Sequence, residues 1–183
     1  MSRIDRLVLR YQRFVAFPWE EQLSGAERIW FVVYDKSDER RIRARIDEFG
    51  IATRRAGHGW KICDLTDSFP QWMAGQEYRE SYFEDPEALE LLLPEYHEHV
   101  VAQVHRALVA RDVGPDTVVA IVGIGSLFGF TRASKVLDDP LVRGHIPGRL
   151  LVFFPGEYED NTYRLLDARD GWNYMAVPIT AHD

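Results

Sequence analysis

Hydrophobic and polar positions follow two periods along the chain, one typical of buried strands and the other of amphipathic helices. Three apolar runs, at residues 28–34, 117–122 and 149–154, are rich in β-branched and aromatic residues and contain little polar alternation. Such runs are typical of strands that are buried on both faces of a sheet. Weaker patterns predict short strands at residues 60–65 and 174–179.

Helical periodicity fills the segments between these strands. Residues 3–16 place apolar side chains on one face and arginines mostly on the other, which predicts an amphipathic helix. A second helix is predicted between an N-cap at Ser37 and a terminating glycine at Gly50. The other predicted helices are a short one containing Phe69 and Trp72, one that begins at Pro86 and is interrupted by Pro94, one from Tyr96 to about Arg111, and one that follows Gly125 and runs through Leu137.

Strands that alternate with helices predict right-handed crossover connections and a mostly parallel central sheet with helices on both faces. The three strongest strands are expected at the centre of this sheet and the last strand at an edge. A chain of 183 residues fits one domain, residues 1–183, with the helix at residues 3–16 packed on it. The predicted fold class is therefore α/β, similar to P-loop or Rossmann folds but without a nucleotide-binding motif.

Composition adds three expectations about the environment of the protein. Apolar residues make up 46% of the chain, enough to bury a core without disulfides, and no apolar run is long enough to span a bilayer. Cys63 is the single cysteine and the first residues lack the apolar segment of a secretory signal, so a cytoplasmic protein is expected. The net charge of −7 makes direct DNA binding an unfavoured interpretation.

The turn Gly123-Ile-Gly125, which directly follows a predicted strand, is the feature closest to a nucleotide-binding motif. A dinucleotide fingerprint needs a third glycine where Phe128 stands, so a tight turn that needs backbone freedom is the favoured interpretation. A P-loop needs a lysine after its glycines to reach the phosphates. No Gly-Lys-Ser or Gly-Lys-Thr occurs in the chain, which excludes ATP hydrolysis by the standard P-loop mechanism.

Residues for metal or nucleophilic chemistry lack the necessary spacing. His97 and His99 are two positions apart and face different directions on a helix, whereas helical zinc ligands are four apart. Cys63 lies in an apolar strand pattern, typical of an inert buried thiol. Ser126 is not within the Gly-x-Ser-x-Gly elbow of a serine hydrolase. We therefore expect no metal, no cofactor and no enzymatic activity.

An arginine-rich helix is one of two remaining candidate surfaces. Arg40, Arg41, Arg43 and Arg45 alternate with acidic residues at spacings that allow ion pairs along the helix. These arginines form either a solvated, ion-paired helix face or a surface that binds a partner.

The second candidate lies where two predicted central strands end, since the carboxyl ends of parallel strands share an edge at which α/β folds place their sites. Pro155-Gly156 is predicted to end the strand at residues 149–154, because proline has no donor and glycine favours a turn. Glu157 is then expected near Arg132 and the start of the helix after Gly125. The cluster is interpreted as either structural or as a ligand or partner site, and its members are Gly123, Gly125, Ser126, Arg132, Pro155, Gly156, Glu157 and Tyr158.

Two of these segments resemble the BrxB family, small proteins encoded in bacterial BREX anti-phage operons. The segments are Ile121-Val-Gly-Ile-Gly-Ser-Leu-Phe-Gly-Phe-Thr-Arg132 and Leu151-Val-Phe-Phe-Pro-Gly-Glu-Tyr158. Two positions depart from the family pattern: Gly129 replaces a usual proline, and residues 173–177, Asn-Tyr-Met-Ala-Val, lack the usual arginine of the closing motif.

The resemblance implies a BREX component that associates with other BREX proteins, above all the PglZ-type, alkaline-phosphatase-like protein. The leading hypothesis is a non-enzymatic adaptor. The alternative is a nucleotide- or anion-binding protein that uses the turn at residues 123–126 with Glu157 and Arg132.

Overall fold

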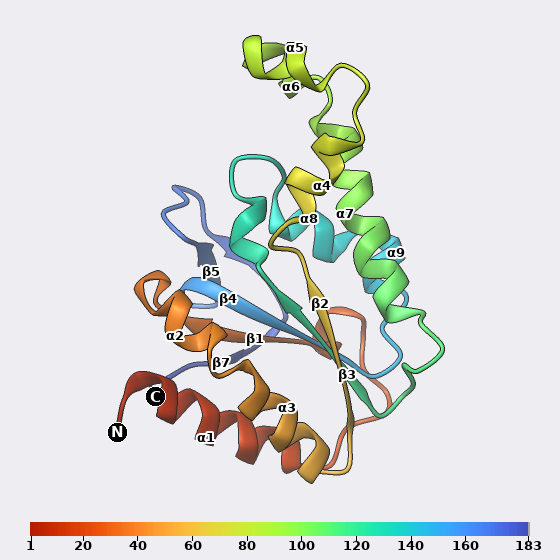
Figure 1. Ribbon diagram of the computed structural model, residues 1–183. Helices are drawn as coiled ribbons and strands as arrows, with labels where there is room; N and C mark the ends of the chain where they lie inside the picture. Colours follow the sequence, from red (N-terminus) through yellow and green to blue (C-terminus); the bar gives the residue numbers. More distant parts are fainter. Residues whose placement is uncertain (183) are drawn as a thin grey trace.

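The structure is a computed structural model that describes residues 1–182, and within them a seven-stranded sheet carries helices on both faces (Figure 1). The strands are β1 (Ile29–Tyr34), β2 (Gly59–Asp64), β3 (Thr117–Val122), β4 (Arg149–Glu159), β5 (Thr162–Leu165), β6 (Trp172–Asn173) and β7 (Val177–Ile179).

The sheet is mixed. Its main path has the order β2-β3-β4-β1-β7, and the four pairs along that path are parallel. Beyond this path, β5 pairs with the last residues of β4, and β6 pairs with β5, both antiparallel. The three strongly apolar runs of the sequence are β1, β3 and β4 at the centre, and β7 is an edge strand, as predicted. It begins at Val177, however, and not at Tyr174. The structure thus confirms an α/β fold, and it adds an antiparallel extension that the sequence analysis did not predict.

Helices cover both faces of the sheet because the central strands are apolar on both sides. Ile29, Phe31 and Val33 of β1 point into one hydrophobic cluster, while Trp30 and Val32 point into another. The first face carries α4 (Ser68–Ala74), α7 (Leu93–Leu108), α8 (Ala133–Asp138) and α9 (Pro140–Arg143), and the second carries α1 (Arg3–Ala16), α2 (Glu39–Arg43) and α3 (Ile46–Arg55).

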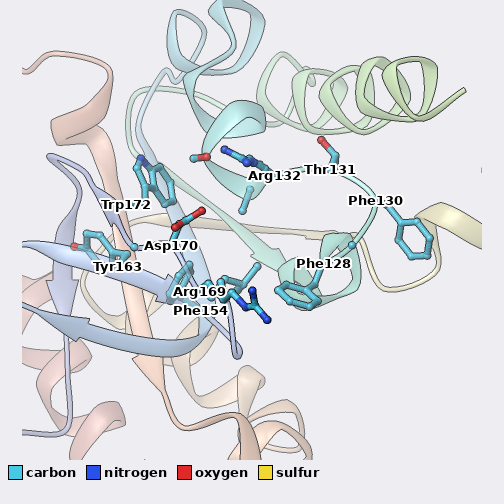
Figure 2. Close-up of a pocket in the computed structure, with 15 residues that line it drawn as sticks. Phe128, Phe130, Thr131, Arg132, Phe154, Tyr163, Arg169, Asp170 and Trp172 are labelled. Atoms are coloured by element: carbon cyan, nitrogen blue, oxygen red, sulfur yellow. The ribbon is translucent and has the colours of Figure 1, made fainter. Parts of the chain in front are cut away.

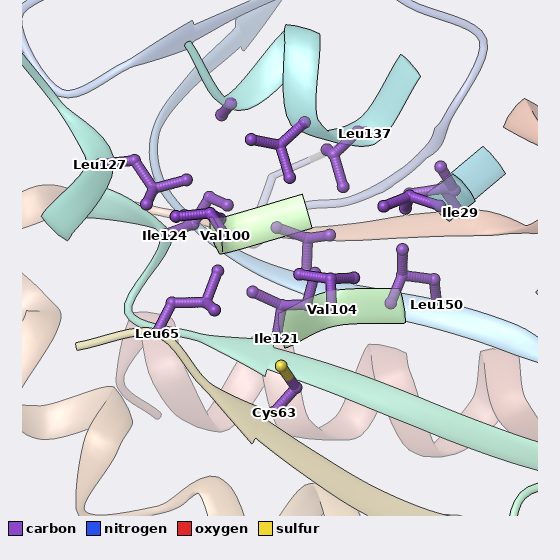
Figure 3. Packing of buried hydrophobic residues seen from close by; sticks show 14 of the residues in the cluster. Ile29, Cys63, Leu65, Val100, Val104, Ile121, Ile124, Leu127, Leu137 and Leu150 are labelled. Carbon is purple, nitrogen blue, oxygen red and sulfur yellow. The ribbon is translucent and has the colours of Figure 1, made fainter. Parts of the chain in front are cut away.

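The core on the first face is closed by α7. Val100 and Val104 are fully buried and pack over Ile121 of β3 and Leu150 of β4 (Figure 3). Cys63 of β2 lies at the side of this cluster, where burial raises the pKa of its thiol to about 11. The thiol is therefore protonated at neutral pH and unsuited to nucleophilic attack.

The predicted helix between Ser37 and Gly50 is wrong at both ends and is not continuous, because α2 ends at Arg43 and α3 starts at Ile46. The segment begins with a 3-10 turn (Lys36–Asp38), and its cap is Asp35, whose side chain accepts a hydrogen bond from the Ser37 N–H. Gly50 lies inside α3, which continues to Arg55. Its missing side chain leaves room for the Trp60 ring, because a Cβ there would lie 2.9 Å from the indole nitrogen. Gly50 is thus a packing glycine and does not end the helix.

The helix predicted from Gly125 through Leu137 is also wrong. A 3-10 turn, η3 (Ile124–Leu127), follows β3, and α8 starts only after an extended residue at Phe128 and a left-handed glycine, Gly129. The helix predicted to begin at Pro86 does so and is interrupted, but Pro94 lies in the first turn of α7, which runs from Leu93 to Leu108 and not from Tyr96 to about Arg111. The remaining helical elements are η1 (Ala26–Arg28), α5 (Arg79–Glu84) and α6 (Pro86–Glu90).

The Pro155-Gly156 pair does not end its strand, which corrects the sequence prediction. Pro155 stands opposite Tyr34, the last residue of β1, so its missing donor falls where the parallel ladder stops. Its carbonyl accepts a hydrogen bond from the Leu166 N–H (2.9 Å). Gly156 then lets β5 approach closely, because a Cβ there would lie 2.0 Å from the Arg164 carbonyl oxygen. β4 therefore changes partner at this point and continues as an antiparallel hairpin.

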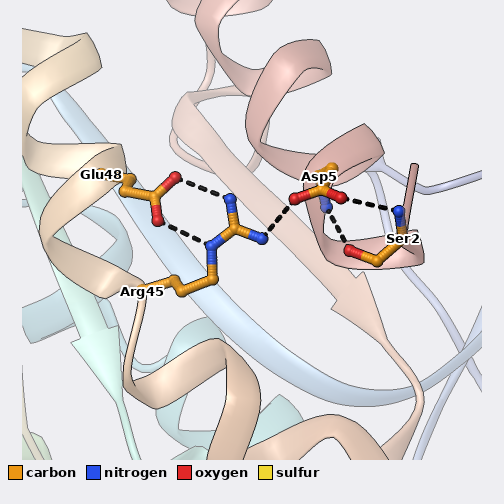
Figure 4. Close-up of polar contacts among 4 residues, drawn as sticks. All are labelled: Ser2, Asp5, Arg45 and Glu48. Atoms are coloured by element: carbon orange, nitrogen blue, oxygen red, sulfur yellow. Dashed lines mark hydrogen bonds and ion pairs between the residues drawn. The ribbon is translucent and has the colours of Figure 1, made fainter.

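The amino-terminal helix α1 is held to the body by a charged network (Figure 4). Ser2 and Asp5 form a capping box, in which each side chain accepts a backbone N–H of the other residue. Arg45 donates to Asp5 (2.6 Å) and to both carboxylate oxygens of Glu48 (2.6 and 2.8 Å). The backbone N–H of Ser2, followed by Arg45, lowers the pKa of Asp5 to about 2.

The turn after β3 is a close approach of two chain segments. Gly123 has a φ of +83°, in the left-handed region that disfavours other residues. A Cβ at Gly123 would lie 2.5 Å from the Thr66 Oγ1 and 2.6 Å from the Thr66 nitrogen. Gly129 has nearly the same φ, +85°, but a Cβ there would meet no atom within 4 Å. The backbone conformation favours glycine at both positions, whereas packing requires glycine only at Gly123.

We predict that Asp5→Asn lowers the melting temperature at pH 7 and that its effect vanishes in acid. An unfolded aspartate has a pKa of about 3.9, above the value of about 2 in the folded chain, so its carboxylate stabilises the fold above pH 4. That contribution is lost as the pH falls from about 4 to about 2. Thermal melts of both proteins from pH 7 to pH 2 test this, with Asp116→Asn, an exposed aspartate, as control. A difference in melting temperature that is independent of pH contradicts the network.

We predict that Gly123→Ala destabilises the protein by about 2–5 kcal/mol, and Gly129→Ala by only about 1–2 kcal/mol. Both variants place an L-residue at positive φ, which costs about 1–2 kcal/mol, but only the first adds overpacking, which costs about 1–3 kcal/mol. Urea unfolding of the two variants measures the difference. Equal free energies of unfolding would show that Thr66 moves away freely.

Candidate functional site

A hollow of about 520 Å³ opens beside Phe154, in the middle of β4 (Figure 2). One wall is the segment between η3 and α8, and the other is the loop between β5 and β6. Phe154 and Tyr163, each only 1% exposed, form its buried floor. The rim of the hollow includes Phe128, Arg132, Arg169, Asp170 and Trp172.

The rim of the hollow carries both apolar and charged groups. The Phe128 side chain is 47% exposed although it is a large aromatic residue. Arg132, Arg169 and Asp170 are exposed, and within residues 1–182 neither guanidinium forms an ion pair. The hollow therefore offers an aromatic surface next to two arginines that are free to bind a carboxylate or another anion.

The floor offers no reactive group. The Tyr163 hydroxyl donates a hydrogen bond to the Ala176 carbonyl oxygen (2.7 Å), and burial raises the pKa of this hydroxyl further above its usual value. Phe31, Phe154 and Trp172 surround the Tyr163 ring. The floor is thus suited to contact with an apolar group and not to proton transfer.

The turn at residues 123–126 lies beside β4, as the sequence predicts, but protein atoms fill the space between the turn and the strand. A Cβ at Gly125 would lie 3.3 Å from the Pro155 ring and 3.8 Å from the Leu166 side chain. The N–H of Ser126 donates to the Gly123 carbonyl (3.0 Å), and that of Phe128 to the Gly125 carbonyl (3.2 Å). An anion site needs N–H groups that point into free space. The turn therefore packs two strands together.

Arg132 and Glu157 do not come together. The side chain of Glu157 is exposed and makes no hydrogen bond or ion pair in the part of the chain that the structure describes. It borders a different hollow, of about 310 Å³, next to α1 and residues 180–182. The reason is the alternation of side chains in the longer β4, where Phe154 and Glu157 are three positions apart and so face opposite sides. Tyr158, on the side of Phe154, packs its ring on Tyr163.

The arginine-rich helix is largely paired within the chain. Arg43 donates to Glu39 (2.6 Å) and to the Thr66 hydroxyl (2.8 Å), and Arg45 belongs to the network that holds α1. Arg41 pairs with the buried Asp38 (3.2 Å), which Arg3 also contacts. Arg40 is exposed and forms no ion pair among residues 1–182. The geometry favours the ion-paired helix face over a partner surface for three of the four arginines.

Sequence reasoning missed Tyr163, Arg169, Asp170 and Trp172, which form half of the hollow. Strands β5 and β6 are too short for a hydrophobic period to be visible. One signal was available: Asp160 and Asn161 stand between Glu159 and Thr162, and both have positive φ (48° and 62°). A two-residue Asp-Asn turn between polar-apolar alternations is typical of a β-hairpin.

Residues 1–182 contain neither a cluster of metal ligands nor a helix that could span a membrane. No group of three or more histidine, cysteine, aspartate or glutamate side chains is placed to hold a metal ion. In the same residues, every helix is too short or too polar to cross a membrane.

Comparison with known proteins places the hollow inside a family match. The family model described as "BREX protein BrxB" matches residues 66–179, which include η3, α8 and strands β3 to β7. No curated protein and no solved structure matches the chain significantly. Because the family match covers more than half of the chain, this protein belongs to the BrxB family of BREX proteins.

Proposed function

We propose that this chain is a non-enzymatic adaptor in a BREX-type phage-defence complex and that it acts by binding other BREX proteins in the cytoplasm. Membership of the BrxB family makes it a component of a BREX system. In this proposal residues 1–183 act as one domain, whose mostly parallel, Rossmann-like sheet carries no nucleotide motif and serves to hold the binding loops. The first partner we propose is the PglZ-type, alkaline-phosphatase-like protein.

The observation that carries the proposal is the chemistry of the hollow at Phe154. An aromatic floor, an exposed phenylalanine and two unpaired arginines are the residue types that dominate binding energy at protein interfaces. The groups on the floor are satisfied and unreactive. The hollow therefore fits a protruding apolar side chain of a partner, with a carboxylate nearby that Arg132 or Arg169 would bind.

The alternative, a nucleotide- or anion-binding protein, keeps one favourable observation. Arg132 and Arg169 both line the hollow and have no acidic partner among residues 1–182. Two observations oppose a site formed by the turn at residues 123–126 with Glu157 and Arg132. The turn is packed against Pro155 and Leu166, and Glu157 borders another hollow. Any anion site would therefore use the arginines without the turn and without Glu157.

We predict that this protein forms a complex with at least one BREX protein of its own operon, the PglZ-type protein first. The tagged chain is co-expressed with each BREX protein and purified, and the affinity of every complex is measured. The double variant Phe128→Ser, Arg132→Glu should weaken binding at least tenfold, because it removes an apolar anchor and reverses a charge at the hollow.

The matched control is Leu9→Ser with Arg13→Glu, which makes the same kinds of change on the exposed side of α1. Circular dichroism confirms that each variant is folded. If the wild-type chain binds none of the BREX proteins, the adaptor proposal is wrong. If it binds them but the hollow variant binds equally well, the adaptor remains and the hollow is not its interface.

We also predict that neither inorganic phosphate nor ATP with magnesium raises the melting temperature, and that ATP is not hydrolysed. Binding to the native state would raise the melting temperature, because it stabilises the folded protein by a free energy that grows with the logarithm of the ligand concentration over Kd. A rise of several degrees that disappears in Arg132→Ala, while Arg164→Ala retains it, would favour the alternative over the adaptor.

A further inference from the structure

The segment between α4 and α7, residues 75–92, projects away from the sheet (Figure 1). We call this segment the arm, and it contains the short helices α5 and α6. Neither helix has a buried residue. Tyr82 of α5, Leu89 of α6 and Leu92 are partly buried against the first hydrophobic cluster, so one side of the arm is packed while its outer surface is free.

The outer surface of the arm carries large apolar side chains that are exposed to solvent. Tyr78 is 63% exposed, Phe83 70% and Leu91 83%. Full burial of a side chain of this kind is worth about 1.5–3 kcal/mol. Within residues 1–182 these three side chains stay mostly exposed and gain little of this energy. Single exposed apolar residues are common, but several together on one projection mark an interaction site.

The negative charge of the arm limits the kinds of partner that it can bind. Residues 77–90 contain six carboxylates and one arginine, a net charge of −5 out of −7 for the whole chain. The carboxylates belong to Glu77, Glu80, Glu84, Asp85, Glu87 and Glu90, and all of them are exposed. Nucleic acid and anionic lipid would be repelled by this charge. A second copy of this acidic chain is disfavoured for the same reason.

We propose that the arm is a docking element that places Tyr78, Phe83 and Leu91 in an apolar groove rimmed by lysines and arginines on a different protein. This inference rests on the proposed adaptor function and gives it a second surface, distinct from the hollow at Phe154. The carboxylates around the apolar residues steer the approach of a basic partner, and the apolar residues supply most of the affinity.

The test uses two arm variants of the full-length chain and the BREX proteins that the wild-type chain retains in co-purification. Phe83→Ser with Leu91→Ser removes the apolar contacts, and Glu80→Lys with Glu84→Lys reverses local charge. Both pairs lie where no residue is buried, so the variants should fold like the wild type, which circular dichroism checks. The matched controls are Val109→Ser with Leu141→Ser, 53% and 48% exposed, and Glu20→Lys with Glu21→Lys.

We expect the apolar arm variant to lose at least tenfold affinity for one BREX protein, while both controls bind like the wild type. The charge-reversed arm should bind more weakly at 50 mM salt, and the difference from the wild type should shrink by 500 mM, since salt screens exposed charges over about one Debye length, ~10 Å at 0.1 M.

Three outcomes would overturn the proposal. If the wild-type chain binds a BREX protein and both arm variants bind it equally well, the arm is not a docking element and the adaptor function stands. If the wild-type chain binds none, the adaptor function fails and the arm proposal fails with it. If light scattering shows self-association that the arm variants abolish, the occupant is a second copy of this chain.

Discussion

The fold depends on the burial of β1, β3 and β4 on both faces. Side chains of a strand alternate between faces, so a strand that is apolar at every position needs a cover on each side of the sheet. In this chain α7, α8 and α9 cover one side, and α1 and α3 cover the other. The hollow and the arm both follow from this constraint, because they occur where the covering elements of the first face end.

The constraint explains which parts of the structure were predictable from the sequence. The apolar runs of the central strands gave their positions and their place in the middle of the sheet, because full burial leaves a strong local signal. A predicted helix boundary was wrong where a glycine has a packing role. Gly50 lies inside α3 and leaves room for the Trp60 ring, and this contact is visible only in the three-dimensional structure. The prediction that Pro155 ends its strand was wrong for a related reason. The missing backbone N–H of Pro155 is harmless only because β1 ends beside it.

Little of the candidate site was predictable from the sequence. Of the cluster expected at this edge of the sheet, only Arg132 lines the hollow, together with Phe154, which directly precedes Pro155. Glu157 was expected there because the strand was thought to stop at Phe154; a strand that continues to Glu159 fixes the side of every later residue. The other wall comes from β5, β6 and their loop, which are held by pairing with β4 and not by a pattern of their own.

The two proposed surfaces have a fixed relation because one aromatic cluster lies between them. Phe69 of α4 stacks on Phe130, a residue of the hollow (3.9 Å between ring centroids), and also contacts Tyr96 of α7. Helices α4 and α7 are the two elements from which the arm extends. The matched residues 66–179 include the arm, this cluster and the hollow, whereas α1, β1 and α3 precede them. In the proposed adaptor, the stacked and partly buried rings of Phe69 and Phe130 join the segment that lines the hollow to the helix from which the arm extends.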